Sequence, residues 1–170
     1  MALIDRRNVN LKIQDGNGNE LTIRFHEFTM SWTETYNWEY VRDRGRLDST
    51  RSDDDDPMTV EFTGQFDYIK GPTMHGDTGI SDALTGKGEA SDWVSADDRV
   101  GYECEPYCVN LVLENEPDCV PSGQSDAHEH ITFERFRPTS IDVDVAEGTI
   151  SVSGECNSQR PTSVRMSPSS

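Results

Sequence analysis

The chain has 170 residues, of which 33% are hydrophobic, and it carries a net charge of −17 at pH 7. This charge argues against a conventional nucleic-acid-binding protein, which needs a basic face to displace the counterions of phosphates. The length predicts one domain with a single core, and four cysteines are too few for a disulfide scaffold.

The charge is built from 32 acidic and 15 basic residues, and lysine occurs only at Lys12, Lys70 and Lys87. Abundant Asp and Glu with scarce lysine is typical of proteins that work in molar salt. There the Debye length falls to roughly 3 Å at 1 M, which screens the self-repulsion. An ordinary acidic protein is the alternative interpretation.

The first residues, MALIDRRNVNLKIQ, contain no apolar stretch of the kind found in signal peptides. No apolar run approaches the ~20 residues of a membrane span. We therefore expect a protein that is made in the cytoplasm and does not associate with membranes.

The first elements predicted from the pattern are strands. Residues 9–25 alternate apolar and polar side chains around DGNGN, which predicts a hairpin. Even positions from Met30 to Tyr40 are aromatic or apolar except Glu34, and the alternation returns in residues 58–68. These segments flank DRGRLDSTRSDDDDP, residues 43–57. We predict a long antiparallel pair with this charged segment as a loop at its tip. Its even, aromatic face would pack inward, and Glu34 would lie at the margin or pair with an arginine.

The remaining elements follow in order. GISDALTG predicts a short helix, with Asp77 or Thr78 as N-cap and Gly86 near its end. YCVNLVLE, ITFERF, SIDVDV and TISVSGECN predict four strands, with AEG as the turn before the last one. A polar tail follows at residues 158–170. The predicted fold class is mainly β: a β-sandwich or barrel-like domain with one short flanking helix and a long β-hairpin.

Two acidic motifs invite a calcium interpretation. DGNGNE begins like an EF-hand loop, but positions six and twelve are Glu20 and His26 rather than Gly and Glu. A hairpin turn is favoured. Asp53 to Asp56 are consecutive, and side chains of an extended chain point alternately to opposite sides, which favours a solvated loop over a cation site.

The cysteines allow several interpretations. Cys104, Cys108 and Cys119 lie near His128 and His130 in sequence, but their spacing matches no familiar zinc pattern. Buried free thiols are favoured for the four cysteines, which include Cys156. A disulfide such as Cys108–Cys119 and a zinc site remain open.

Catalysis is not indicated by the sequence. Asp142 and Asp144 share one face of a predicted strand, an arrangement that permits acid–base chemistry. No nucleophile, phosphate loop or oriented histidine accompanies them, so a solvent or interface face is favoured. We predict no catalytic residue, no metal and no cofactor.

Three stretches together resemble a known family: DPMTVEFTGQFDYI, WVSADDRVGYECEPYCVNLVLENEPDC and ITFERFRPTSIDVDVAEGTISVSGECNSQRPT. Their order and spacing resemble the tail tube (major tail) proteins of long-tailed, siphovirus-like viruses, over about residues 8–165. No single motif is specific. The lysine-poor acidity points to a virus of halophilic archaea.

The resemblance implies a single tail tube domain over residues 1–170 that forms hexameric rings. These rings stack into a tube through which the genome leaves. Residues 1–8 would be an N-terminal arm, and residues 43–57 an inter-ring loop. The other partners implied are the tape measure, tail terminator and baseplate proteins, in a virion tail assembled in the host cytoplasm. DNA would pass without specific binding.

The odd faces of the long strands would line the channel of such a tube, and the charged segment would contact neighbouring rings. The predicted lumen-facing residues are Ser31, Thr33, Thr35, Asn37, Glu39, Thr59, Glu61, Thr63, Gln65 and Asp67. The predicted contact residues are Arg42, Arg44, Arg46, Leu47, Arg51, Asp53, Asp54, Asp55 and Asp56. The alternatives are a tail-completion or baseplate ring protein of the same fold, or a monomeric extracellular β-sandwich binding module. An enzyme is a more distant alternative.

Overall fold

The computed structural model describes residues 9–23, 27–65, 79–96, 106–115, 128–144 and 146–166. The described part is mainly β with one short α-helix, as predicted. Its elements are β1 (Val9–Gln14), β2 (Glu20–Ile23), β3 (Glu27–Thr33), β4 (Trp38–Asp43), β5 (Arg46–Ser52), β6 (Met58–Gln65), α1 (Ile80–Thr85), the 3₁₀ turn η2 (Gly88–Ala90), β7 (Val109–Asn115), β8 (His128–Asp144), β9 (Thr149–Cys156) and β10 (Thr162–Met166). Within these ranges, no helix has the length and apolar character needed to cross a membrane.

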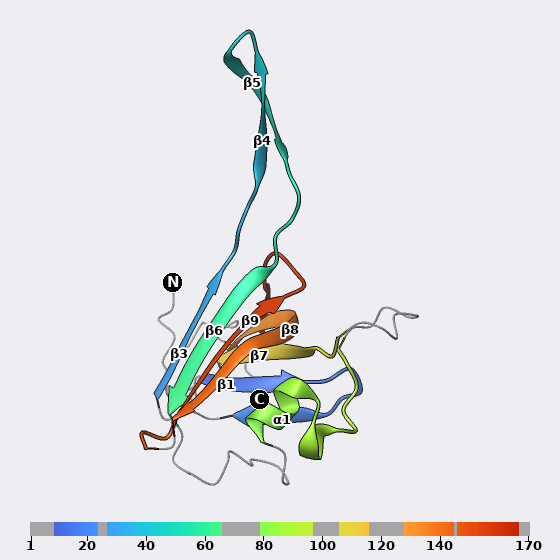
Figure 1. Cartoon of the computed structure of the whole chain (residues 1–170), viewed down its shortest axis with the longest axis vertical. Helices are drawn as coiled ribbons and strands as arrows, with labels where there is room; N and C mark the ends of the chain where they lie inside the picture. Colours follow the sequence, from blue (N-terminus) through green and yellow to red (C-terminus); the bar gives the residue numbers. More distant parts are fainter. Residues whose placement is uncertain are drawn as a thin grey trace.

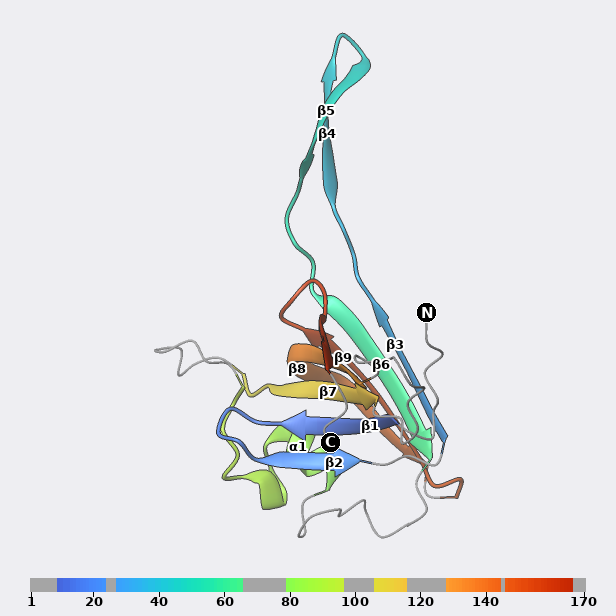
Figure 2. The same cartoon turned by 180° about the vertical axis from the view of Figure 1, so that it is seen from behind.

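One antiparallel sheet forms both layers of the body. Its strand order is β2-β1-β7-β8-β9-β6-β3, with β10 also paired to β8. The first part of β8 pairs with β7 and β10, whereas the second part pairs with β9. The strand groups β3-β6-β9 and β2-β1-β7 cross one another in both views (Figures 1 and 2).

The bend in β8 explains why two predicted strands are one. ITFERF and SIDVDV were expected as separate strands, but both lie within β8. Arg135 takes a left-handed conformation (φ 54°), and the pairing register shifts near Pro138. Such irregularities increase strand bending. They let one strand run from the first layer into the second.

The core lies between the layers and consists of inward-facing apolar side chains. Met58, Val60 and Phe62 of β6 are each at most 1% exposed, and Phe133 and Phe136 of β8 are fully buried. Helix α1 adds Ile80, Ala83 and Leu84, and the other layer contributes Leu11, Ile13, Leu21, Ile23, Leu111 and Leu113. Each large buried side chain contributes roughly 1.5–3 kcal/mol through the hydrophobic effect.

The DGNGN segment is a hairpin turn between β1 and β2, as predicted. Asp15 accepts hydrogen bonds from the backbone N–H groups of Asn17 (3.0 Å), Asn19 (2.7 Å) and Val94 (3.0 Å), and from the Asn19 side-chain amide (2.7 Å). A Cβ on Gly16 would lie 2.2 Å from the Ser95 carbonyl oxygen. The Asp15 carboxylate therefore links the turn to residues 93–95 through hydrogen bonds. All of these donors come from the protein itself.

Helix α1 ends as predicted but begins differently. Gly86 is the C-cap in the left-handed conformation (φ 66°), and its N–H donates to the Asp82 carbonyl. The N-cap is Gly79, without a side-chain cap, so the predicted Asp77 or Thr78 cap is wrong. Asp77 and Thr78 themselves lie outside the described residues.

Residues 34–57 form a projection that we call the arm, and it departs from the prediction in two ways. The predicted strand from Met30 to Tyr40 is interrupted at residues 34–37, and the expected loop at 43–57 contains strand β5. Strands β4 and β5 pair around a two-residue turn, Arg44–Gly45, with φ of 50° and 81°. Positive φ at both positions is the signature of the tight turns that favour hairpins. The arm extends far from the body (Figure 1).

The C-terminal segment, which was predicted only as a polar tail, includes a strand. The polar tail predicted at residues 158–170 contains β10, which pairs with β8 from Thr162↔Thr132 to Met166↔His128. Residues 1–8, the predicted N-terminal arm, lie outside the described part of the chain.

Candidate functional site: a hydroxyl-lined sheet face with two open edges

Four adjacent strands present one exposed face of small polar and acidic side chains. Two rows of residues paired in register cross it: Thr29–Thr63–Ser151–Asp142 and Ser31–Glu61–Ser153–Ser140. We call this surface the hydroxyl face. Its residues are Thr29, Ser31, Thr33, Thr59, Glu61, Thr63, Ser140, Asp142, Ser151, Ser153 and Glu155.

The alternation of β6 fixes which side chains reach this face. Its burial alternates strictly from Met58, with even positions buried and Thr59, Glu61 and Thr63 exposed. Phe62 points into the core, so the predicted inward and outward faces of this strand are confirmed. A one-residue shift would have reversed them.

The chemistry of the hydroxyl face is neutral to acidic. The hydroxyl oxygens of Thr63 and Ser151 lie 3.1 Å apart, within hydrogen-bond distance. At the margin, Arg137 lies opposite Glu155 in register, and its guanidinium donates to the Pro106 carbonyl at 3.4 Å. The two central rows contain no lysine or arginine. These two rows offer no charge-assisted contact to a phosphate.

The predicted lumen residues divide between the body and the arm. Ser31, Thr33, Thr59, Glu61 and Thr63 belong to the hydroxyl face. Gln65 is half-buried at its lower end, and its side-chain amide donates to the Glu147 carbonyl at 3.2 Å. Asp67 lies outside the described residues.

The other three predicted lumen residues lie in the arm. The Thr35 carbonyl accepts a hydrogen bond from Gln159 (3.1 Å). The Asn37 amide donates to the Asp54 carbonyl (3.1 Å) and to the Asp56 carboxylate (2.7 Å). Glu39 forms an ion pair with Arg51. None of the three lies on the four strands that carry the hydroxyl face.

The aromatic side of the arm contradicts the prediction that it packs inward. Tyr36, Trp38 and Tyr40 are 46%, 54% and 57% exposed. The described arm is a two-stranded ribbon without a second layer, so its aromatic side chains have no layer of this chain to pack against. Glu34 accepts hydrogen bonds from Trp32 (3.3 Å) and Tyr36 (2.6 Å), and the latter bond raises the pKa of Tyr36. Glu34 is therefore hydrogen-bonded to Trp32 and Tyr36 at the margin of the body.

The sequence reasoning missed half of the hydroxyl face. Ser151, Ser153 and Glu155 of β9 alternate with buried Ile150, Val152 and Gly154. A local pattern shows this alternation, but it does not reveal that β9 lies between β6 and β8. Asp142 is exposed, which fits the surface role favoured for it.

Two edges of this four-stranded region are open among the described strands. Strand β3 pairs with β6, and residues 137–144 of β8 pair with β9; neither has a described partner on its other side. Three antiparallel pairings separate them, so β3 and β8 run in opposite directions. Exposed edges favour pairing with another chain.

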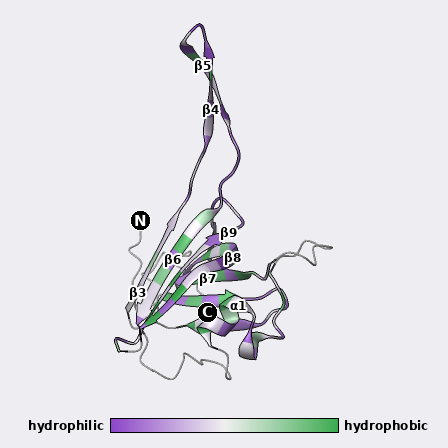
Figure 3. Cartoon of the chain, viewed as in Figure 1, coloured by the Kyte–Doolittle hydropathy of each residue, from purple (hydrophilic) through white to green (hydrophobic). Residues whose placement is uncertain are grey.

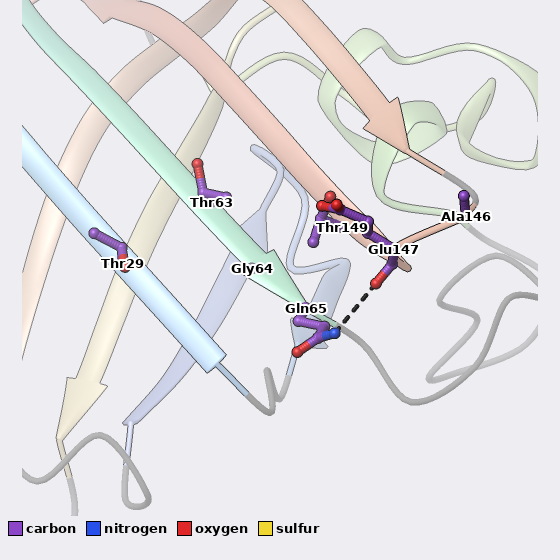
Figure 4. Close-up of a pocket in the computed structure, with 7 residues that line it drawn as sticks. All are labelled: Thr29, Thr63, Gly64, Gln65, Ala146, Glu147 and Thr149. Atoms are coloured by element: carbon purple, nitrogen blue, oxygen red, sulfur yellow. Dashed lines mark hydrogen bonds between the residues drawn. The ribbon is translucent and has the colours of Figure 1, made fainter.

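An open depression of about 460 Å³ lies at the lower end of the hydroxyl face (Figure 4). Its walls come from β3, the end of β6 and the turn between β8 and β9. The lining residues are Thr29, Thr63, Gly64, Gln65, Ala146, Glu147 and Thr149. Nothing in this lining resembles a catalytic arrangement, and no group of three potential metal ligands occurs among the described residues.

The cysteines that the structure describes are buried free thiols. Cys108 and Cys156 are both buried and unpaired. Burial, with the neighbouring Cys108, raises the pKa of Cys156 to about 12, so its thiol stays protonated and is a poor nucleophile. Cys104 and Cys119 lie outside the described residues, whereas His128 and His130 lie on β8.

The fold is shared with components of contractile injection systems. The sheath/tube terminator of the extracellular contractile injection system PVC, in its extended state, matches with a TM-score of 0.51 at 10% identity, covering 91% of this chain and 92% of the other. The tube-terminating cap of the anti-feeding prophage matches with a TM-score of 0.51 at 9% identity, covering 97% and 93%. At these identities, the similarity establishes the fold alone. No protein-family model and no curated protein matches the sequence.

Proposed function

We propose that this protein is a structural, non-enzymatic subunit of a viral tail, which assembles into hexameric rings that stack into the tail tube. The observation that carries this proposal is the hydroxyl face bounded by two open, oppositely directed strand edges. The hexamer number comes from the resemblance to tail tube proteins. The shared fold with tube terminator and cap chains supports a role in a tail.

Ring closure follows from the direction of the two edges. When β3 of one copy lies beside the second part of β8 in the next copy, the new pairing is antiparallel, as within each subunit. The same heterologous contact repeats until the ring closes, and closure pairs both of these open edges. The hydroxyl face then lies on one continuous surface of a multi-chain barrel.

The hydroxyl face suits a channel that DNA must pass without being held. Hydroxyl groups bind phosphates weakly, and carboxylates repel them. Arginine or lysine at these positions would retain DNA through charge-assisted hydrogen bonds and counterion release. The protein's role in genome ejection would therefore be passive.

A tube-terminating ring of the same fold is the second candidate. It is favoured by the two structural matches, which are a sheath/tube terminator and a tube-terminating cap. A tube subunit must stack on copies of itself without limit, whereas a terminator stops at one ring. Electron microscopy of the purified chain distinguishes them, because only the tube subunit gives long filaments.

Molar salt is the proposed working condition, and the host would be a halophilic archaeon. A ring multiplies the charge of −17 sixfold, so close packing of the subunits requires strong screening. We expect rings and tubes to dissociate when salt is lowered to tens of millimolar (a Debye length of roughly 20–30 Å). Tubes that persist in that buffer would contradict the halophilic assignment.

The channel assignment is tested by placing a cation on the hydroxyl face. Thr63→Arg tubes, assembled in high salt, fixed and moved to roughly 0.1 M salt, should retain labelled DNA that wild-type tubes release. Ser49→Arg adds the same charge to the arm and serves as the matched control. Equal retention by both variants would place the hydroxyl face outside the channel.

A further inference from the structure

The open edge strand β3 has an apolar side and a hydroxyl side. Residues directly opposite in an antiparallel pair share a face, and Trp32 lies opposite Val60, which is fully buried. Trp32 is therefore on the core side of the sheet, whereas Ser31 belongs to the hydroxyl face. The Trp32 ring meets the Phe133 ring edge-on, with centroids 5.3 Å apart, yet Trp32 remains 38% exposed. The core side is thus incompletely covered at this edge.

The second part of β8 has the same two sides at the other open edge. Ile141 and Val143 lie opposite Val152 and Ile150, which are buried, so both are on the core side. Ile141 packs against the core, but Val143 is 56% exposed. Asp142, between them, belongs to the hydroxyl face. Hydrophobic and hydrophilic residues also alternate along neighbouring strands of the body, such as β6 (Figure 3). Each open edge therefore carries a partly exposed apolar side chain on the core side of the sheet.

The partner that fits both edges at once is a second copy of this chain. The two edges run in opposite directions, so β3 of one copy pairs antiparallel with β8 of another. Both faces continue across the boundary when odd positions of β3 lie opposite even positions of β8, because a shift by one residue would exchange the faces. The same contact covers the exposed apolar residue of each edge.

Local features of β8 limit where a neighbouring strand can pair. Pro138 has no N–H group to donate to a ladder. The register with β9 shifts between Pro138 and Ser140, and Thr139 has no opposite residue in β9. Such a bulge disturbs the regular edge. The regular part of the open edge therefore runs from Ser140 to Asp144.

One register uses this regular edge fully, and it places Ser31 of one subunit opposite Asp142 of the next. Residues 29–33 of β3 then lie opposite residues 144–140 of β8. The Ser31 hydroxyl, a hydrogen-bond donor, faces the Asp142 carboxylate, an acceptor. On the other side of the sheet, Trp32 lies opposite Ile141.

The two nearest registers that keep the faces together fit less well. A shift by two residues in one direction moves Trp32 opposite Thr139, where β8 is irregular. An equal shift in the other direction brings residues 34 and 35, which are not part of β3, opposite Ile141 and Ser140. Only the intermediate register pairs the whole regular edge with β3 and keeps Trp32 opposite regular strand.

We propose that neighbouring subunits of a ring join in this register, with Trp32 of one subunit packed on Ile141 and Val143 of the next. We call this contact the seam. The inference rests on the proposed function and specifies its side-to-side contact. The seam has hydroxyl and carboxylate groups on the hydroxyl face and apolar side chains on the core side. Molar salt screens ion pairs but leaves such an apolar contact intact.

Pairs of cysteine substitutions in the full chain test the register. Opposite Cα atoms of an antiparallel pair lie about 4.5–5.5 Å apart, a distance that a disulfide spans, whereas residues displaced by two positions lie about 7–8 Å apart. Ser31→Cys with Asp142→Cys is the predicted pair. The matched controls combine Ser31→Cys with Ser140→Cys or with Asp144→Cys. Within one subunit β3 and β8 are separated by three strand spacings, roughly 14 Å, so a disulfide at these positions joins different chains.

We expect mild oxidation of assembled rings to give covalent multimers from the predicted pair at a yield at least about tenfold above either control. The wild-type chain, with its native cysteines, supplies the background. Multimers formed mainly by one of the control pairs would overturn the register and leave the ring proposal intact. Rings without multimers from any pair would overturn the seam. A wild-type chain that stays monomeric in high salt would overturn the proposed function as well.

A carboxylate on the core side tests the apolar part of the seam. Val143→Asp is compared with Val164→Asp on β10, where the wild-type valine is 50% exposed. Both variants should leave the melting temperature of the unassembled protein nearly unchanged. Val143→Asp should raise the concentration needed for rings in high salt at least about tenfold, and Val164→Asp less than about threefold. Rings of Val143→Asp that form like wild type, or equal losses in both variants, would overturn the apolar seam.

Discussion

The body and the arm carry the same sequence pattern with opposite structural results. In β6, Val60 and Phe62 alternate with polar residues and are buried, whereas Trp38 and Tyr40 alternate in the same way in β4 and are exposed. The difference is the second layer, which the body has and the described arm lacks. An alternating strand therefore indicates a side that needs covering, but not whether the same chain covers it.

The largest expected effect is on the free energy of unfolding, which a substitution in the body should lower far more than one in the arm. Phe62→Ala leaves a cavity in the core and should lower the free energy of unfolding by about 3–5 kcal/mol. Trp38→Ala in the exposed arm should change it by less than about 0.5 kcal/mol. Urea unfolding of the unassembled protein measures both. Equal losses would mean that the arm packs on its own body.

The next effect concerns a glycine that the inner face of β9 requires. A Cβ on Gly154 would lie 2.5 Å from Phe136 Cζ and 2.4 Å from the Arg137 carbonyl oxygen. Gly154→Ala should therefore cost about 1–3 kcal/mol through overpacking. Ser153→Ala, one position away on the hydroxyl face, is the control and should be nearly neutral. A neutral Gly154→Ala would contradict the observed packing of Phe136.

A smaller, pH-dependent effect is expected from the β1–β2 turn, in which Asp15 accepts hydrogen bonds from Asn17, Asn19 and Val94. Burial alone would raise the pKa of Asp15, but hydrogen bonds from Asn19, Val94 and Asn17 lower it below its ordinary value of 3.8. The stabilisation is complete above pH 3.8 and is lost as the pH falls through the lower, folded-state pKa. Asp15→Asn should cost about 1–2 kcal/mol at neutral pH and reduce the loss of stability in acid. Unfolding measured between about pH 2 and pH 7 checks this, and an unchanged pH profile would contradict it.

The smallest effect is expected from the ion pair of the arm. Glu39→Ala and Arg51→Ala should leave the melting temperature of the unassembled protein unchanged, because exposed ion pairs contribute little and salt screens them. A clear drop in either variant would show that the Glu39–Arg51 ion pair stabilises the unassembled protein.

Much of the fold was predictable from local pattern, because burial in β1, β2, β6 and β9 follows alternation and turn chemistry. The hydroxyl face was predictable only on β3 and β6. Its other half depends on the placement of β9 beside β6, a long-range pairing that no local signal specifies. The single strand β8 was missed because residues 137–139 interrupt the alternation between ITFERF and SIDVDV, where the pairing register also shifts. Strand β5 was hidden by its charged residues, which normally indicate a loop.

The most direct test of the ring proposal is an electron-microscopy reconstruction of the purified chain in roughly 2–3 M salt. The account predicts rings with an open channel, β3 of each subunit beside β8 of its neighbour, and Ser151 and Ser153 facing the axis. Rings in which these serines face outward, or a solution of monomers alone, would contradict it.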